Sequence, residues 1–352
     1  MHLTKEDILR YLGNICLMIG YQIMLWGNFK YGLLIKFIGG LLSVPFAIKL
    51  KLWDVLFLCA FFGFTEFSKM IQLFMRGWQL IFFVEYNGYM IGFNHLGKLG
   101  RLGNQMFQFA SLKGIARNNG YEYCIPPSRN QNEWEDHQLL IPFKLSNTTQ
   151  LNIQSIDLNR PIVSESGFSF DENLFNNCPD WVSLFGYFQS EKYFKHIRSE
   201  ILGDFEFKDE IKIPCQELIS ELKNPISLHI RRTDYLVNPN HTLLDLSYYK
   251  NALKEFDEDS SVLVFSDDSE WCKTQPLFSD DRFLIAEGNS NYIDLCLMTL
   301  CKGHIIANSS FSWWGAWLSK SKKVIAPSGW FKGSDNEHLD TSDLIPEEWV
   351  VI

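Results

Sequence analysis

The chain has 352 residues, of which 46% are hydrophobic and 15% aromatic, so it can bury a large core and is long enough for two or three domains. Its formal net charge of −9 argues against a nucleic-acid-binding protein. The eight cysteines are scattered without a C-x-x-C pair, which argues against zinc and redox motifs and is typical of a reducing compartment.

Residues 1–85 are more apolar than the rest of the chain. The runs 8–27 and 31–48 contain one charged residue each and approach the roughly 20 apolar residues that cross a bilayer. A third run, 53–67, is apolar but shorter. We therefore expect residues 1–85 to form membrane-embedded helices, and a buried helical subdomain is the alternative. Basic residues flank both sides of these runs and leave the topology open.

A pattern typical of α/β proteins begins near residue 78. Strand-like segments at 79–86 and 89–93 are followed by the glycine-rich turn GKLGRLG and by a helix whose apolar residues recur at helical spacing. Gly120 is expected to end that helix, and a strand is expected at 121–125. A strand, a helix and a strand in this order predict a parallel sheet.

Strands and helices alternate more clearly after residue 222. The expected strands are 226–230, 262–265, 283–285, 304–307 and 324–326. The expected helices between them are 247–256, 268–274, 291–301 and 312–319. This alternation predicts a second doubly wound sheet, so that two α/β domains follow the apolar region, at 90–222 and 223–352. Ligands of such folds bind at the carboxyl ends of the strands.

The segment SLHIRRTDYL ends the expected strand 226–230 with two arginines. Residues two apart on a strand share a face, so His229 and Arg231 are expected to point one way and Arg232 the other. Arginine binds phosphate through two parallel hydrogen bonds, which makes Arg231 a candidate phosphate ligand. A surface arginine pair held in salt bridges is the alternative.

The segment ANSSFSWWGAWL leads from an expected strand into a helix. Ser309, Ser310 or Ser312 can cap that helix. The free N–H groups of its first turn, together with the helix dipole, form an anion site. Ordinary helix capping is the alternative and accounts for one of the serines.

Asp294 lies on an expected helix that is apolar around most of its surface, where an unpaired carboxylate is costly. Two N–H donors from the edge of a guanine would satisfy it, and a buried pair with a lysine or an arginine is the rival explanation. Asn104 and Gln105 open the first α/β helix, where they can contact a sugar or a phosphate. Helix capping is the alternative for Asn104.

Four motifs together resemble one enzyme family: GRLGNQMFQ (100–108), HIRRTDY (229–235), FSDD (265–268) and NSSFSWWGAW (308–317). From about residue 90 to 352 the chain resembles inverting fucosyltransferases that use GDP-fucose, and most closely the bacterial-type α-1,2-fucosyltransferases of glycosyltransferase family 11. The resemblance implies an α/β fold of GT-B type, in which two Rossmann-like domains face a cleft. Domain 90–222 would then form the acceptor side, and domain 223–352 would bind the GDP-sugar.

The implied reaction transfers L-fucose from GDP-β-L-fucose to the 2-hydroxyl of a galactoside, which is part of an oligosaccharide or a glycolipid in cell-surface glycan synthesis. Transfer of another GDP-sugar, α-1,6- or O-fucosyl transfer, and a membrane scaffold with an inactive sugar-binding domain are the alternatives. No metal or other cofactor is expected, since the single Asp-x-Asp, at 257–259, precedes a strand. The expected location is the inner membrane, with the catalytic part in the cytoplasm.

The residue pattern and the resemblance together suggest roles for individual residues. Arg231 would clamp the pyrophosphate, and Arg232 would anchor Asp234 or the domain interface. Asp234 is the first choice for the catalytic base, and positioning of the arginines is the alternative role for it. Glu165 and Glu191 are possible acids on the acceptor side. The expected GDP-fucose contacts are His229, Arg231, Asp294, Ser309, Ser310, Phe311 and Ser312. Asn104 is grouped with the catalytic residues, and Gln105 with the acceptor side.

Overall fold

The computed structural model describes residues 4–25, 29–52, 89–128, 136–321, 323–332 and 340–352. The chain divides into two compact units, Met1–Asn87 and Gly88–Ile352. The expected strand 79–86 and the third apolar run, 53–67, lie outside the described residues.

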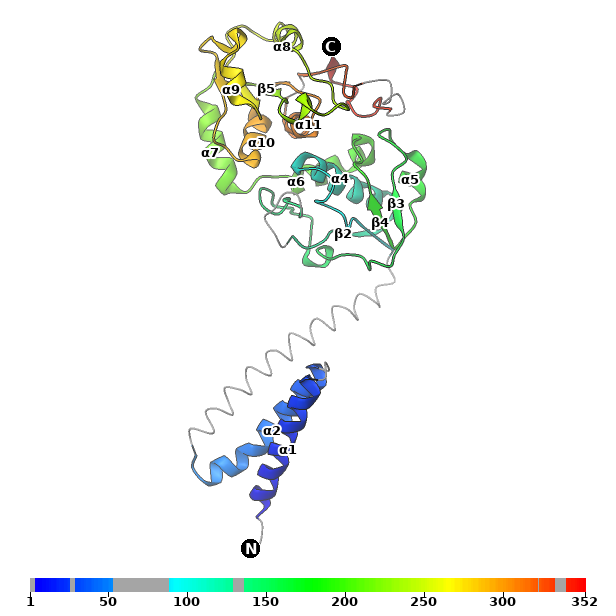
Figure 1. Ribbon diagram of the computed structural model, residues 1–352, viewed down its shortest axis with the longest axis vertical. Coiled ribbons are helices and arrows are strands. Elements are labelled where there is room, and N and C mark those ends of the chain that lie inside the picture. Colours follow the sequence, from blue (N-terminus) through cyan, green and yellow to red (C-terminus); the bar gives the residue numbers. More distant parts are fainter. Residues whose placement is uncertain (1–3, 26–28, 53–88, 129–135, 322, 333–339) are drawn as a thin grey trace. The chain divides into compact units, whose positions relative to one another are not determined.

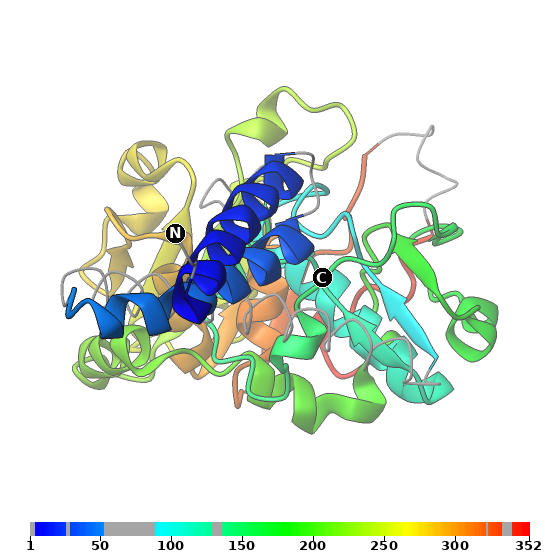
Figure 2. The same cartoon turned by 90° about the horizontal axis from the view of Figure 1, so that it is seen from below.

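The first unit contains two helices that lie side by side, α1 (Lys5–Leu25) and α2 (Phe29–Lys49) (Figures 1 and 2). They approach closely at Gly39, where a Cβ atom would lie 2.8 Å from the carbonyl oxygen of Gly13. None of the helices in the described part of the chain is long and apolar enough to span a membrane. The expectation of spans at 8–27 and 31–48 is therefore not supported.

A four-stranded parallel sheet forms the first half of the second unit, in the order β2-β1-β4-β3. Its strands are β1 (Met90–Gly92), β2 (Glu122–Cys124), β3 (Ile162–Ser164) and β4 (Val182–Phe185). Helix α4 (Leu102–Asn119) connects β1 to β2 and ends at Gly120, whose φ of 69° is left-handed. The parallel strand–helix–strand unit expected here is confirmed. Among the described residues, helices α5 (Glu172–Asn177) and α6 (Arg198–Asp204) also belong to this half, whereas α7 (Asp209–Ser220) packs against α10 (Asn291–Leu300) of the second half (Figure 1).

A six-stranded parallel sheet forms the second half, in the order β10-β9-β8-β5-β6-β7. Its strands are β5 (Ile226–Ile230), β6 (Val262–Ser266), β7 (Phe283–Ile285), β8 (Gly303–Ile305), β9 (Val324–Ala326) and β10 (Val350–Val351). Its helices are α8 (Leu246–Leu253), α9 (Ser269–Lys273), α10 (Asn291–Leu300) and α11 (Ser310–Trp317). Because all strands are parallel, the residues that follow β5, β6, β8 and β9 meet at one edge of the sheet.

The two halves share one core, which is built where α4 packs on α11. The ring of Phe107 lies 4.4 Å from that of Trp313 and 5.0 Å from that of Trp314. All three rings are buried, so burying them stabilises this contact by several kcal/mol, at roughly 1.5–3 kcal/mol for each large side chain. The three tryptophans of the NSSFSWWGAW motif are therefore core residues.

The segment after residue 340 makes hydrogen bonds to both halves of the second unit. The backbone N–H of Phe170, in the first half, donates to Asp343 Oδ2 over 2.9 Å. The indole N–H of Trp313 donates to the carbonyl oxygen of Leu344 over 2.8 Å. Strand β10 then pairs with β9 at the edge of the second sheet.

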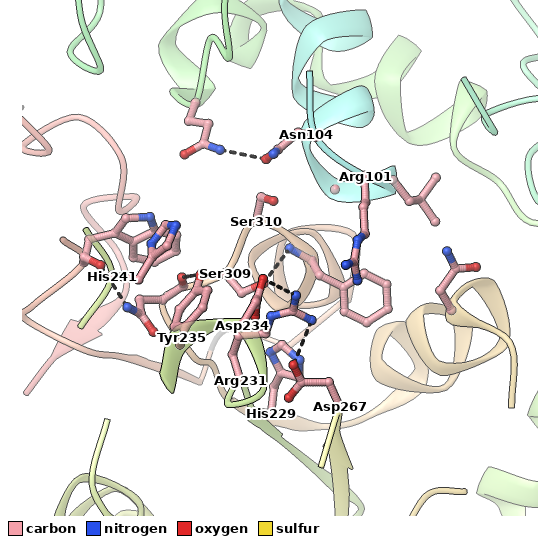
Figure 3. A pocket seen from close by; sticks show the side chains of 18 of the residues that line it. Arg101, Asn104, His229, Arg231, Asp234, Tyr235, His241, Asp267, Ser309 and Ser310 are labelled. Atoms are coloured by element: carbon pink, nitrogen blue, oxygen red, sulfur yellow. Dashed lines mark hydrogen bonds and ion pairs between the residues drawn. The ribbon is translucent and has the colours of Figure 1, made fainter. Parts of the chain in front are cut away.

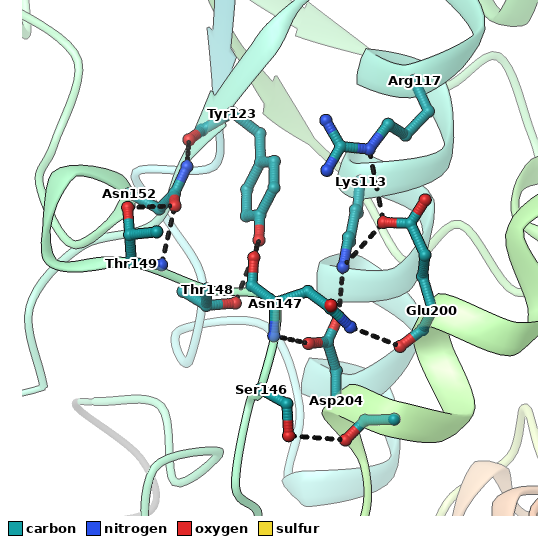
Figure 4. A network of polar contacts seen from close by, with 11 residues as sticks. Lys113, Arg117, Tyr123, Ser146, Asn147, Thr148, Thr149, Asn152, Glu200 and Asp204 are labelled. Atoms are coloured by element: carbon teal, nitrogen blue, oxygen red, sulfur yellow. Dashed lines mark hydrogen bonds and ion pairs between the residues drawn. The ribbon is translucent and has the colours of Figure 1, made fainter.

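A buried ion pair fixes the outer part of α4 (Figure 4). The ammonium of Lys113 donates to Asp204 Oδ2, and both side chains are fully buried. Lys113 Nζ also lies 3.2 Å from Glu200, and Asp204 Oδ1 accepts a hydrogen bond of 2.8 Å from the backbone of Asn147. This network connects α4, α6 and the loop near residue 147.

Replacing Lys113→Met should destabilise the protein by about 3–5 kcal/mol, because it leaves the carboxylate of Asp204 buried without its cation. Lys144→Met is the matched control. Lys144 Nζ lies 3.1 Å from both Glu206 and Asp209, but this pair is solvent-exposed, so its loss should change the free energy of unfolding by about 1 kcal/mol or less. Urea unfolding of both variants measures the difference, and equal effects would contradict the prediction.

Candidate active site

A cavity of about 830 Å³ lies between the two halves of the second unit. It is lined by residues that follow strands of the six-stranded sheet and by the first turn of α4 (Figure 3). Its volume is within the range of sites for small molecules and cofactors.

His229 is the last but one residue of β5, and its ring is buried at the floor of the cavity. Its Nδ1 shares a hydrogen bond of 2.8 Å with Ser312 Oγ. Burial, with the nearby charge of Arg231, lowers the pKa of His229 to about 3. His229 is therefore neutral at physiological pH and suited to orienting a ligand rather than to transferring protons.

Arg231 lines the same cavity, as the strand alternation predicts. Its guanidinium lies between two carboxylates, 2.7 Å from Asp234 Oδ2 and 3.2 Å from Asp267 Oδ2 (Figure 3). Its side chain is 18% exposed, so water shields its charge only in part. The two ion pairs hold the planar guanidinium in one orientation.

Arg232 points away from the cavity. Its Nε donates to Asp268 Oδ2 over 2.9 Å, and its guanidinium lies 4.2 Å from the ring centre of Trp271. The expectation that Arg232 anchors Asp234 or the domain interface is therefore wrong. Arg231 binds Asp234 instead, because Asp234 follows the strand on the cavity side.

Asp234 lies at the cavity with about half of its side chain exposed. Burial by itself raises its pKa, but the hydrogen bond and the charge of Arg231 outweigh that effect, and the charge of Arg101 adds to them. The net result is a pKa below the ordinary value, so Asp234 is ionised at neutral pH and available to accept a proton.

Helix α11 begins at the cavity with Ser309 as its N-cap. Ser309 Oγ accepts from the backbone N–H of Phe311 over 3.4 Å, and Ser310 and Phe311 line the cavity with it. Ser312 does not line the cavity and holds His229 instead. The first turn of α11 thus directs its N–H groups and the positive end of its dipole toward the cavity.

The first turn of α4 meets the first turn of α11 at Gly103. A Cβ atom at Gly103 would lie 2.7 Å from the backbone nitrogen of Phe311 and 2.8 Å from Ser310 Oγ. No side chain fits in this space without displacing backbone. The close approach brings the N-terminal ends of two helices, one from each half, to the same cavity.

Asn104 lines the cavity and accepts a hydrogen bond of 2.8 Å from Gln189 Nε2. It does not cap α4, because Arg101 is the N-cap residue. Gln105 is buried outside the cavity lining, where its Oε1 accepts from the backbone of Gln138 over 2.8 Å. Gln105 therefore holds a loop and does not reach the cavity.

Asp294, in the first turn of α10, lines the cavity next to Asn289, whose Nδ2 donates to it over 2.9 Å. Burial raises the pKa of Asp294. Within the described part of the chain no ion pair with a lysine or an arginine is found for Asp294, so the rival explanation from the sequence does not apply.

Glu165 and Glu191 lie outside the cavity lining. The carboxylate of Glu165 accepts from the backbone N–H groups of Tyr187 and Phe188, the second over 2.8 Å. Glu191 Oε1 accepts from Lys195 over 2.8 Å, and its Oε2 accepts from the indole of Trp317 over 2.9 Å. Both carboxylates therefore hold neighbouring protein groups in place.

Several cavity residues were not among those singled out in the sequence. Arg101 and Asp267 belong to the motifs GRLGNQMFQ and FSDD, and Asp267 directly follows β6, which is a signal that could have found it. Tyr235, the last residue of the motif HIRRTDY, also lines the cavity, together with aromatic side chains from other loops: Phe168, Tyr187, His241, Trp330 and Phe331. No spacing in the sequence connects these loops.

Among the described residues, no group of three or more His, Cys, Asp or Glu side chains is arranged to hold a metal ion. In the Asp-x-Asp at 257–259, Asp259 pairs with Lys223 and does not line the cavity.

The pKa of Glu165 predicts a pH-dependent stability. Burial raises it from 4.5 to about 7, although two backbone N–H groups oppose the shift. Because the folded protein then holds this proton more tightly than the unfolded chain, the contribution of Glu165 is greatest below about pH 4.5 and is lost as pH rises to about 7.

Urea unfolding of the wild type and of Glu165→Gln between pH 4.5 and pH 8 measures this effect. The wild type should lose stability relative to the variant as pH rises to about 7, and the difference should be constant above that. Parallel curves for the two proteins across the whole range would contradict the prediction.

Comparison with known proteins gives the family context of this site. The family model described as "Glycosyl transferase family 11" matches residues 65–352, and a model described as "Domain of unknown function (DUF8641)" matches residues 7–71. The first match begins before residue 90, where the motif resemblance starts.

Three curated relatives show which proteins the chain is similar to. An Escherichia coli protein named alpha-1,2-colitosyltransferase is 32% identical over 72% of this chain and 96% of the relative. The Escherichia coli O-antigen biosynthesis glycosyltransferase WbnK is 28% identical over 71% of this chain and 97% of the relative. The Bos taurus galactoside 2-alpha-L-fucosyltransferase SEC1 is 27% identical over 67% of each chain.

Proposed function

The chain belongs to glycosyl transferase family 11, and from this premise we propose that it transfers L-fucose from GDP-β-L-fucose to the 2-hydroxyl of a galactoside, with inversion. The observation that carries the proposal is that Arg231 and the first turn of α11 lie at one cavity, where together they would bind a pyrophosphate. The two parallel sheets on either side of that cavity support a GT-B architecture.

Arg231 is proposed to act on the leaving group of the reaction. As the bond between the sugar and the β-phosphate breaks, negative charge grows on the phosphate, and both Arg231 and the N–H groups near Ser310 act where that charge develops. We propose that these groups stabilise GDP as it leaves and that the reaction needs no metal ion. Asp294 would accept hydrogen bonds from the N–H groups of guanine at the α10 end of the cavity.

Asp234 is the proposed catalytic base. Of the three acids considered for this role, Glu165 and Glu191 have both carboxylate oxygens engaged outside the cavity lining, whereas Asp234 lines the cavity. The acceptor oxygen forms a bond to the sugar carbon on the face opposite the phosphate, and its proton passes to Asp234. The electron pair of the broken bond leaves with GDP. Asn104, across the cavity, would orient the acceptor.

A second candidate activity is transfer of a related deoxy sugar, which the identity of 32% to a protein named alpha-1,2-colitosyltransferase favours. The acceptor is proposed to be a β-galactoside in an oligosaccharide or a glycolipid, in keeping with the names of the other relatives. Incubation with GDP-fucose and GDP-colitose in turn, with lactose-type acceptors, and NMR of the product linkage separate the two activities. Products without an α-1,2 linkage would overturn the proposal.

Replacing Arg231→Ala should weaken GDP binding by roughly ten- to a hundredfold, because it removes charge-assisted hydrogen bonds to the pyrophosphate. Arg231→Lys should recover little of this loss, since an ammonium does not reproduce the planar fork. Arg232→Ala is the matched control, because Arg232 binds Asp268 and does not line the cavity. Calorimetric titration with GDP tests all three, and equal losses at both positions would contradict the assignment.

Replacing Asp234→Asn should lower kcat by roughly 10²–10⁴-fold while the Kd for GDP stays within a few-fold of the wild type, because the change removes a proton acceptor and preserves size. Steady-state kinetics beside the GDP titration measure both quantities. If GDP affinity and rate fall in proportion, Asp234 acts by holding Arg231 and is not the base.

A further inference from the structure

A row of aromatic rings covers one wall of the cavity and crosses from one half of the unit to the other. The rings of Tyr235 and His241 are stacked, with centres 4.3 Å apart and planes 3° apart. The ring centre of His241 lies 5.6 Å from that of Phe331. An isolated antiparallel bridge also joins the backbones of these two residues. Tyr235 is fixed as well, because its hydroxyl donates to the carbonyl oxygen of Asn308 over 2.8 Å.

The row continues into the first half. The ring centre of Phe168 lies 4.8 Å from that of Phe331 and 5.8 Å from that of Tyr187. The ring planes of Phe168 and Tyr187 differ by 15°. All five rings line the cavity, although they come from four separate segments of the chain. A surface of this kind, made by several segments around a hollow, is typical of a ligand site rather than of a hydrophobic core.

The position of this wall distinguishes it from the donor site. In the six-stranded sheet, β9 and β8 lie on one side of β5, and β6 and β7 lie on the other. Phe331 follows β9, whereas Asp267 follows β6 and Asp294 belongs to α10, which follows β7. Figure 3 shows Tyr235 and His241 on one side of the Arg231–Asp234 pair and Asp267 on the other. The wall therefore lies beyond the phosphate site, opposite the end proposed for guanine.

We propose that Phe168, Tyr187, Phe331, His241 and Tyr235 form the acceptor subsite, in which the terminal galactose stacks its apolar C–H face on the rings. The inference rests on the proposed function and names the groups that select its acceptor. One face of a galactopyranose carries mainly C–H groups, and burying it against flat rings removes apolar surface from water. Its 2-hydroxyl is equatorial at the edge of the ring, so stacking leaves this group directed along the cavity toward Asp234.

Polar side chains near these rings can bind the hydroxyl groups of the sugar. The hydrogen-bonded pair Asn104–Gln189 lines the cavity together with Tyr187 and can bind hydroxyls at the edge of the ring. Glu165 is a positioning residue, because its hydrogen bonds to the N–H groups of Tyr187 and Phe188 hold the turn that carries Tyr187. Gly186 in this turn leaves no room for a side chain, since a Cβ atom there would lie 2.5 Å from Glu165 Oε1.

Kinetics of Phe168→Ala and Tyr187→Ala in the full chain test the subsite. Each should raise the KM for lactose about tenfold or more and leave the KM for GDP-fucose within about twofold. Tyr187→Phe should stay close to the wild type, because it keeps the ring. Phe283→Ala is the matched control: Phe283 is half-buried at β7 and does not line the cavity, so both KM values should be unchanged. A larger rise in the KM for GDP-fucose than for lactose would overturn the proposal.

A second measurement does not depend on turnover or on the folding of the alanine variants. Saturation-transfer difference NMR of methyl β-galactoside with the GDP-loaded wild type should saturate the ring hydrogens of the apolar face most strongly. Phe168→Leu keeps apolar volume without a flat ring and should lose this signal. The signal supports the subsite even if no fucose is transferred, a result that would remove only the proposed reaction. Absence of the signal in the wild type overturns the subsite.

Discussion

The contact between the first turns of α4 and α11 is the constraint on which the site depends. Gly103 lies against the backbone of Ser310 and Phe311, and one turn further along Phe107 packs on Trp313. A side chain at Gly103 would force the helices apart and open the cavity. Because the contact is so close, both helix dipoles act on the same small volume, and the buried rings behind it prevent the two halves from separating.

The charged side chains around Arg231 also fix the geometry of the site. Two carboxylates, of Asp234 and Asp267, hold the guanidinium in one orientation, and the charge of Arg231 in turn keeps Asp234 ionised. His229 below it stays neutral, so the floor of the cavity adds no positive charge that varies with pH. Preorganised charges of this kind lower the energy of a transition state without rearrangement during the reaction.

The sequence predicted those features that follow from local periodicity. Strand alternation placed His229 and Arg231 on one face, and the capping pattern placed the start of α11 next to them. It did not predict the partner of Arg232, because Asp268 lies after β6 and is distant from Arg232 in the sequence. The roles of Glu165 and Gln105 were also missed, since hydrogen bonds to distant backbone decide whether a polar side chain reaches a cavity. The aromatic wall, made by loops near residues 168, 187, 241 and 331, has no local signature.

The hydrogen bonds of Asp343 and Leu344 have a consequence for how the cavity is completed during synthesis. Phe170, two residues from the wall residue Phe168, is held by Asp343, which the ribosome adds far later. A nascent chain that has just exposed β4 contains every strand of the first sheet, but it lacks α11 and the segment after residue 340. Domains fold as their segments emerge, so the ring surface of the first half is left uncovered during this interval. Chaperone engagement of the nascent chain is therefore expected to concentrate on that surface.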